Sequence, residues 1–132
     1  GIQYNPLTLN RVHYSNPQYM DKKTVVGLIE EITIFGKNKQ IKVIARIDTG
    51  AKSNSIDLGL AKELGINPNG KTTIVKSSMG KVKREVVDLD IEIAGKKFKG
   101  IFTLANRSHL KYPALIGRNI LVNGFIIDPS KD

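Results

Sequence analysis

Apolar and polar residues alternate along much of the chain, which is the pattern of strands with one face in a core and the other in solvent. The alternation is clearest in residues 82–93, where four apolar side chains face one way and three acids face the other. The apolar residues are Val87, Leu89, Ile91 and Ile93, and the acids are Asp88, Asp90 and Glu92. We therefore expect these acids to form a solvated face rather than a paired catalytic set.

Shorter runs rich in β-branched residues predict the remaining strands. Apolar residues crowd the stretch 24–35, and a turn at 36–39 leads from it into a strand over 41–47, so the two runs form a hairpin. A further hairpin tip is expected at 77–81. The other expected strands are at residues 72–76, 98–104, 114–116 and 124–128.

One stretch, residues 53–66, has a helical period instead. Ile56, Leu60 and Leu64 are spaced by four, which places them on one face of a helix. Ser55 or Asp57 can cap its first turn, and Gly65 can adopt the left-handed conformation at its end. A second short helix is expected from about Arg118. Many strands with tight turns and so little helix predict an all-β fold, either a barrel or a sandwich.

The first 19 residues differ from the rest. They contain two Asn-Pro dipeptides and no helical or strand period, so we expect 1–19 to be a flexible leader. Met20 resembles a natural start, which favours a leader left from expression over a pro-segment that occupies the active site. Residues 20–132 form one predicted domain, long enough to bury a single core.

Composition excludes several kinds of site. The chain has no cysteine, and His13 and His109 are its only histidines, so disulfides are excluded and neither a metal site nor any other cofactor is expected. No apolar run is long enough to span a membrane, and no signal peptide is evident, so we expect a cytoplasmic protein. The net charge of +9 is scattered and few aromatic residues accompany it, which favours solubility over nucleic-acid binding.

Two motifs carry the candidate chemistry. Asp48-Thr49-Gly50-Ala51 follows the strand over 41–47, where an Asp and a Gly often make only a turn. Far downstream, the short strand 114–116 passes into Ile116-Gly117-Arg118-Asn119. In this order the two motifs resemble those of the retropepsins, the aspartic proteases of retroviral type, and the resemblance covers residues 24–128.

The chain is still more similar to a prokaryotic retropepsin-like family once labelled ATP-dependent zinc proteases. The similarity lies in Asp48 to Lys52, in Ser78-Met79-Gly80 with Arg84, in Asn106-Arg107-Ser108, and in residues 115–118 with 125–130. Neither part of that label has support in the residues, because the chain has no His-Glu-x-x-His and no Gly-rich loop ending in Lys-Ser or Lys-Thr.

The resemblance implies a closed retropepsin-type β-barrel with a flap hairpin and one or two short helices. It also implies an aspartic endopeptidase, whose chemistry needs two carboxylates that share one proton. The chain has one Asp-Thr-Gly, and Asp57, Asp88, Asp90 and Asp128 lack that setting. The second carboxylate must then be Asp48 of another copy, so we expect a homodimer that takes a peptide or protein substrate.

The resemblance also implies roles for particular residues. Thr49 would hydrogen-bond across the dimer axis, Gly50 would admit the substrate backbone, and Ala51, in place of a hydroxyl residue, implies a less acidic pH optimum than that of pepsin. The flap and substrate-binding residues would be Ser77, Ser78, Met79, Gly80 and Lys81. The supporting residues would be Lys52, Arg84, Arg107, Ile116, Gly117, Arg118 and Asn119.

Three of the supporting residues carry specific expectations. Arg84 and Arg107 are candidates for positioning an acidic or carboxylate-bearing substrate. Lys52 stands where retroviral enzymes have an Asp that pairs with the Arg of Gly-Arg-Asn, so Arg118 must find another partner. The resemblance further suggests association with ATP-grasp peptide ligases.

Two other functions stay open at this point. The first is a catalytically inactive retropepsin fold that binds peptides or a partner protein, because an intact Asp-Thr-Gly is necessary but not sufficient for activity. The second is a small basic β-barrel that binds nucleic acid.

Overall fold

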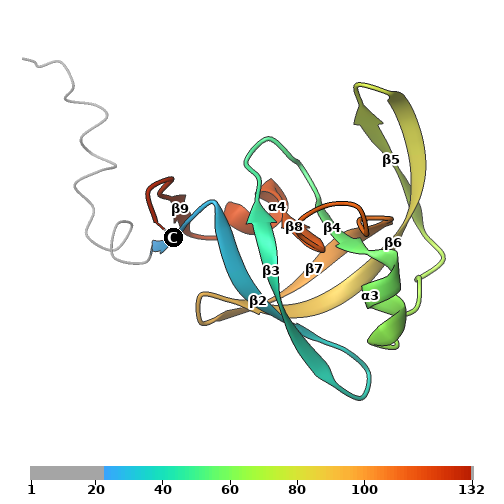
Figure 1. Cartoon of the computed structure of the whole chain (residues 1–132), viewed down its shortest axis with the longest axis horizontal. Coiled ribbons are helices and arrows are strands. Elements are labelled where there is room, and N and C mark those ends of the chain that lie inside the picture. Colours follow the sequence, from blue (N-terminus) through green and yellow to red (C-terminus); the bar gives the residue numbers. More distant parts are fainter. Residues whose placement is uncertain (1–22, 132) are drawn as a thin grey trace, which may run out of the picture.

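The computed structural model describes residues 23–131, so the predicted leader over 1–19 and the start at Met20 lie outside the described residues. The described chain consists mainly of strands, with two short helices (Figure 1). The strands are β1 (Thr24–Val26), β2 (Ile29–Phe35), β3 (Gln40–Ile47), β4 (Asn54–Asp57), β5 (Thr72–Ser77), β6 (Gly80–Ile93), β7 (Lys96–Ala105), β8 (Ala114–Ile116) and β9 (Phe125–Ile127). The helices are α3 (Leu58–Glu63) and α4 (Arg118–Leu121).

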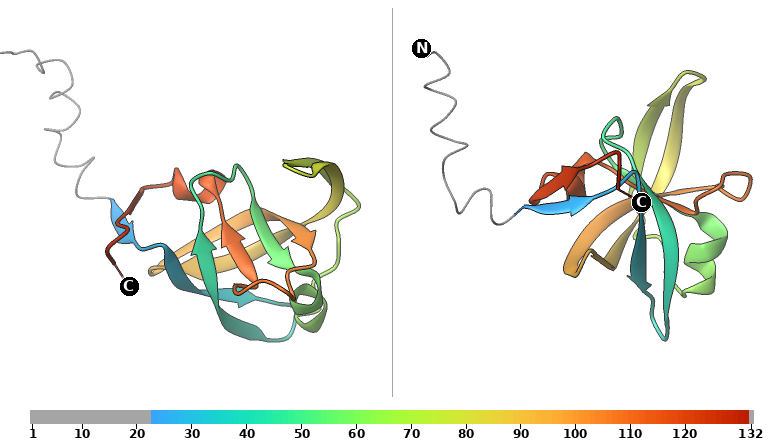
Figure 2. Two further views of the ribbon diagram at one scale, coloured as in Figure 1. Left: turned by 45° about the horizontal axis from the view of Figure 1, so that its top comes forward. Right: turned by 60° about the vertical axis from the view of Figure 1, so that its left-hand side comes forward.

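Six strands close into a barrel. They lie in the order β2-β3-β8-β4-β7-β6, and β6 returns to β2 through an antiparallel pairing that runs from Ile32↔Ile93 to Phe35↔Asp90. Among the described strands β5 pairs only with the first part of β6, so the two form a hairpin that projects from the barrel (Figures 1 and 2). The predicted all-β closed barrel, with its hairpin and two short helices, is confirmed.

Two parallel pairings determine where the sequence motifs meet. Strand β3 pairs in parallel with β8, with Ile47 opposite Ile116, so the two strands end at the same end of the barrel. Strand β4 lies on the other side of β8 and pairs in parallel with β7. The loop after Ile47 and the turn after Ile116 are therefore neighbours, although they are far apart in sequence.

The barrel interior holds the core that the alternation predicts. Val87, Ile91 and Ile93 are fully buried, whereas Asp88 and Asp90 on the same strand are exposed. The other fully buried large side chains include Ile32, Ile34, Ile56, Phe102 and Ile116.

Residues 53–57 do not belong to a helix, so that part of the helical prediction is wrong. Asn54 and Ile56 are fully buried and point into the barrel, which is the period-two pattern of a strand. The helix begins only at Leu58, where the Asp57 side chain caps it by accepting from the Leu60 N–H at 3.3 Å. The expected end at Gly65 is confirmed, with φ +71°.

The apolar stretch 24–35 is divided between two sheets. Strand β1 leaves the barrel and pairs in parallel with β9, forming a separate two-stranded sheet. The break falls at Gly27, where any Cβ would overlap the carbonyl oxygen of Lys131. Among residues 23–131, no helix is both long and apolar enough to cross a lipid bilayer.

The adjacent residues Phe102 and Ile101 test the account of the core. Phe102 is fully buried in the barrel, whereas Ile101 is 54% exposed on the same strand. We expect Phe102→Ala to lower the free energy of unfolding by about 3–5 kcal/mol, because it leaves a cavity in the core. Ile101→Ala should change it by no more than about 0.5 kcal/mol. Equilibrium denaturation of both variants measures the difference, and equal losses would contradict the assigned strand register.

Candidate active site

Asp48 lies at the end of β3, at the point where the chain leaves the barrel. Its N–H donates to the carbonyl oxygen of Ile116 at 2.9 Å, which continues the parallel pairing with β8. Its Oδ1 accepts the N–H of Gly50 at 2.9 Å, and its carbonyl oxygen accepts the N–H of Ala51 at 3.2 Å. The carboxylate is therefore held by its own loop, and within residues 23–131 its Oδ2 has no hydrogen-bond partner.

The segment after β8 holds this loop through backbone hydrogen bonds. The N–H of Arg118 donates to the Ala51 carbonyl at 2.8 Å, and that of Asn119 donates to the Lys52 carbonyl at 3.1 Å. Gly117 is needed at the crossing, since a Cβ there would lie 2.8 Å from the Ala51 oxygen and would overlap the Ser53 oxygen. The two sequence motifs thus form one unit.

Arg118 has the alternative partner that the sequence required. Its Nη1 donates to the Thr49 carbonyl oxygen at 2.9 Å, so it supports the loop through a main-chain acceptor rather than through an acid. Lys52, which occupies the position of the retroviral Asp, is exposed.

Asn54 is a supporting residue that the sequence analysis missed. It is fully buried, its Oδ1 accepts the Gly117 N–H at 2.8 Å, and its Nδ2 donates to the Ile101 carbonyl at 3.1 Å. Its side chain therefore connects β4, β7 and the Gly117 turn. The available signal was the alternation of Asn54 with Ile56, which the helical interpretation of this stretch concealed.

A cleft of about 850 Å³ lies beside Asp48. The loop after β3 lines part of it, and residues Thr73–Lys76 and Arg84 of the β5–β6 hairpin line another part. The hairpin rises from the same end of the barrel as that loop (Figures 1 and 2). Among the described lining residues Asp48 is the only acid, and the cations are Lys52, Lys76, Arg84, Arg107 and Arg118.

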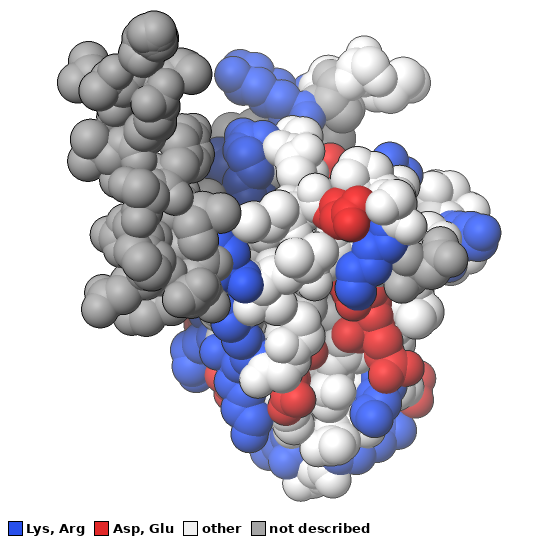
Figure 3. Space-filling model, turned by 90° about the vertical axis from the view of Figure 1, so that its left-hand side faces the viewer, with Lys and Arg blue, Asp and Glu red and all other residues white. Residues whose placement is uncertain are grey.

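The described lining of the cleft is thus strongly basic. On the face shown in Figure 3, basic and acidic side chains are interspersed, as scattered charge predicts. Around Asp48, in contrast, cations gather without matching acids. An anionic ligand is the natural complement of such a cleft.

Arg107 is the most constrained of these cations. Its backbone N–H donates to Asp57 Oδ1 at 2.8 Å, and its Nε donates to the Tyr112 carbonyl at 3.0 Å. Burial lowers the pKa of Arg107, and the nearby Arg46 lowers it further, while Asp57 and Asp48 oppose the shift. The sequence singled out Arg107, but it gave no reason to notice Arg46 or Asp57 beside it.

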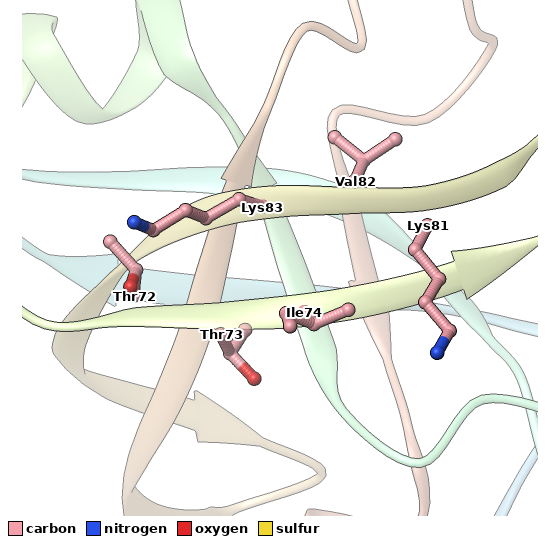
Figure 4. A pocket seen from close by; sticks show the side chains of 6 residues that line it. All are labelled: Thr72, Thr73, Ile74, Lys81, Val82 and Lys83. Atoms are coloured by element: carbon pink, nitrogen blue, oxygen red, sulfur yellow. The ribbon is translucent and has the colours of Figure 1, made fainter.

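The predicted flap residues form the tip of the β5–β6 hairpin. Gly80 has the positive φ that the turn requires, +111°, and Met79 is 92% exposed. Ser78, Met79, Gly80 and Lys81 are not among the described residues that line the cleft beside Asp48, and Ser77 is the last residue of β5. Lys81 instead borders an open depression on the hairpin together with Ile74 and Lys83 (Figure 4).

Comparison with known proteins gives the family. The model of the RimB-like family, described as "Retropepsin-like aspartic endopeptidase RimB", matches residues 67–132, which is half of the chain. The chain belongs to this family. The matched part contains the hairpin, Arg107 and the Gly117 turn, whereas Asp48 lies before it, so the position of Asp48 rests on the geometry given above.

Individual relatives agree with a retropepsin-like fold. A protein of unknown function from Legionella pneumophila superposes with a TM-score of 0.62 at 25% identity, covering 82% of this chain and 95% of its own. The simian foamy virus protease superposes with a TM-score of 0.53 at 18% identity, covering 71% of this chain and 91% of its own, which shows likeness of fold alone.

A curated relative is considerably longer than this chain. The "Probable alpha-L-glutamate ligase" of Shewanella halifaxensis is 28% identical over 84% of this chain, but the match spans 30% of the ligase's own length. Within residues 23–131, no group of three or more His, Asp or Glu side chains is placed to hold a metal ion.

Asn54 provides a test of how the site is built. Asn54→Ala would leave the Gly117 N–H and the Ile101 carbonyl without partners, each at a cost of about 1–3 kcal/mol. We therefore expect a loss of about 2–6 kcal/mol in the free energy of unfolding. Asn67→Ala, at an exposed position, is the control and should change it by about 0.5 kcal/mol or less. Chemical denaturation of both variants measures this, and an Asn54 variant as stable as the control would refute the connection.

Proposed function

We propose that this chain is an aspartic endopeptidase whose catalytic dyad consists of Asp48 from each of two identical copies. The observation that carries the proposal is the placement of Asp48, which lies in a cleft with its Oδ1 held by the Gly50 N–H. Hydrogen bonds from the 117–119 segment support the same loop. Membership of a retropepsin-like family supports this chemistry.

The dyad would act on water and on the peptide carbonyl together. One ionised carboxylate accepts a proton from a water molecule, whose oxygen then attacks the carbonyl carbon. The other carboxylic acid donates its proton to the carbonyl oxygen, giving a tetrahedral diol. The carboxyl group that took the water proton then gives it to the peptide nitrogen, the C–N bond breaks, and the other carboxylate takes a proton from a diol hydroxyl, so the dyad is again singly protonated. Every step uses carboxylates and water alone, so the reaction needs no cofactor.

The second copy is required because the cleft of one chain contains a single acid. Asp48 is the only acid among the described residues that line it. Two carboxylates about 3 Å apart share one proton near neutral pH, because both cannot be ionised so close together. One of them is therefore the acid and the other the base. A two-fold axis beside Asp48 brings the two copies of this residue together.

The substrate we propose is an acidic peptide, rich in glutamate or aspartate. Five cations line the cleft, against one acid that the chemistry itself uses. The similar region in the Shewanella protein belongs to a chain named for glutamate ligation, which supports the same substrate chemistry. A peptide ligase that adds glutamate is accordingly the partner activity we propose.

Replacing the Asp48 carboxylate tests catalysis directly. Asp48→Asn removes one proton-transferring group from each copy, so we expect cleavage of a mixed peptide library to fall to background. The matched control is Asp90→Asn, because Asp90 is exposed on the barrel and its ion pair with Lys99 is exposed as well. The control should cleave like the wild type. Mass spectrometry of the digests provides the measurement, and equal cleavage by wild type and Asp48→Asn would refute the proposal.

The oligomeric state is a separate test. Sedimentation velocity over a wide concentration range should show a monomer–dimer equilibrium, and specific activity should rise as the dimer forms. A protein that stays monomeric at every concentration and still cleaves peptides would contradict the shared dyad.

A further inference from the structure

The Arg107 guanidinium is oriented before any ligand binds. Its backbone N–H is held by Asp57 Oδ1, and its Nε is held by the Tyr112 carbonyl. Asp57 is itself anchored, because it caps helix α3 through the Leu60 N–H and its own N–H donates to the Pro113 carbonyl. Both the start and the end of the Arg107 side chain are therefore constrained.

The two Nη groups of Arg107 have no such partner. Within residues 23–131 they form no hydrogen bond, and no carboxylate oxygen lies within ion-pairing distance of the guanidinium. A guanidinium that is partly buried without a counter-ion is costly to the protein, and the nearby Arg46 adds repulsion. An anion beside Arg107 would relieve both costs.

The other cations of the cleft are less suited to this role. Arg118 already donates to the Thr49 carbonyl, and Lys52 and Lys76 are exposed. Arg84 is partly buried, but no side-chain hydrogen bond to another described residue orients it. A planar guanidinium with its Nε fixed and its Nη groups available matches the two oxygens of a carboxylate.

We propose that Arg107 is a specificity-determining residue that binds a carboxylate of the substrate next to the scissile peptide bond. Arg107 lines the same cleft as Asp48, so a substrate group bound to its guanidinium lies in the cleft that contains the proposed catalytic acid. The inference rests on the proposed function, because it places this contact within a proteolytic site. The carboxylate belongs to a Glu or Asp side chain, since the proposed enzyme cleaves within a chain.

Matched peptides and variants of the full chain test this assignment. One peptide carries Glu on both sides of the scissile bond and the other carries Gln, and each is made with a free and with an amidated C-terminus. Arg107→Gln should lower kcat/KM for the Glu peptide about 10- to 100-fold, because a charge-assisted pair is lost. The Gln peptide should change less than about twofold, since its amide never formed that pair. Arg107→Lys should lower kcat/KM for the Glu peptide less than Arg107→Gln does, because lysine keeps the positive charge but lacks the paired donors of the guanidinium.

Lys111→Gln is the control for net charge. Lys111 lies on the same loop as Arg107, its Nζ lies over the Tyr112 ring, and it does not line the cleft. This variant should treat both peptides as the wild type does, and amidation of the C-terminus should change nothing. The assignment is overturned if Arg107→Gln slows both peptides equally, or if only peptides with a free C-terminus discriminate between Arg and Gln.

Peptide binding separates this inference from the proposed function. In the Asp48→Asn background, Arg107→Gln should weaken binding of the Glu peptide about 10- to 100-fold and leave the Gln peptide unchanged, as measured by calorimetry. If no variant cleaves and this binding difference is nevertheless present, the proteolytic function fails while the carboxylate subsite stands. If cleavage occurs and the difference is absent, the subsite assignment fails and the proteolytic function stands.

Discussion

The hydrogen bonds between the loop after β3 and the turn after β8 are the constraint on which the site depends. Parallel pairing places the ends of the two strands at one end of the barrel. The N–H groups of Arg118 and Asn119 donate there to the carbonyl oxygens of Ala51 and Lys52. Only a glycine fits at position 117, because the loop backbone passes where a Cβ would lie. The buried amide of Asn54 connects the same turn to the barrel wall. Asp48 thus occupies a position that the whole barrel supports.

Electrostatics gives the cleft a second property, which is independent of how the loop is held. Among the described lining residues one carboxylate lies with five cations, and Arg107, the most constrained cation, is partly buried without a carboxylate oxygen of residues 23–131 at ion-pairing distance. A site with this balance favours ligands that bring negative charge. The same imbalance is the basis of the proposed shared dyad, since Asp48 is the only acid among the described residues that line the cleft.

Much of the fold could be predicted from local pattern. In β6 the buried residues alternate with more exposed ones from Val87 to Ile93, so the two faces of that part of the strand were assigned correctly. The stretch around Ile56 was misassigned because a spacing of four residues satisfies a helical period and a strand period alike. This stretch is a strand because it pairs with both β7 and β8, and such pairing between distant residues cannot be read from the local sequence.

The sequence could single out residues of the candidate site, but it could not predict their contacts. Asp48 and Gly117 were recognisable because their neighbours in sequence are distinctive. The partner of Arg118 was not, since a main-chain carbonyl is present at every residue and leaves no trace in the sequence. Arg46 and Asp57, which surround Arg107, come from separate strands and meet it only in the folded barrel.

The measurement that tests the central claim most directly is the activity of mixtures of wild type and Asp48→Asn at constant total concentration. After subunit exchange in an equal mixture, about one quarter of the dimers contain two Asp48 carboxylates, and the shared dyad predicts about one quarter of the wild-type rate. Activity that falls in direct proportion to the wild-type fraction, to about one half in the equal mixture, would show that each chain acts alone and would contradict the account.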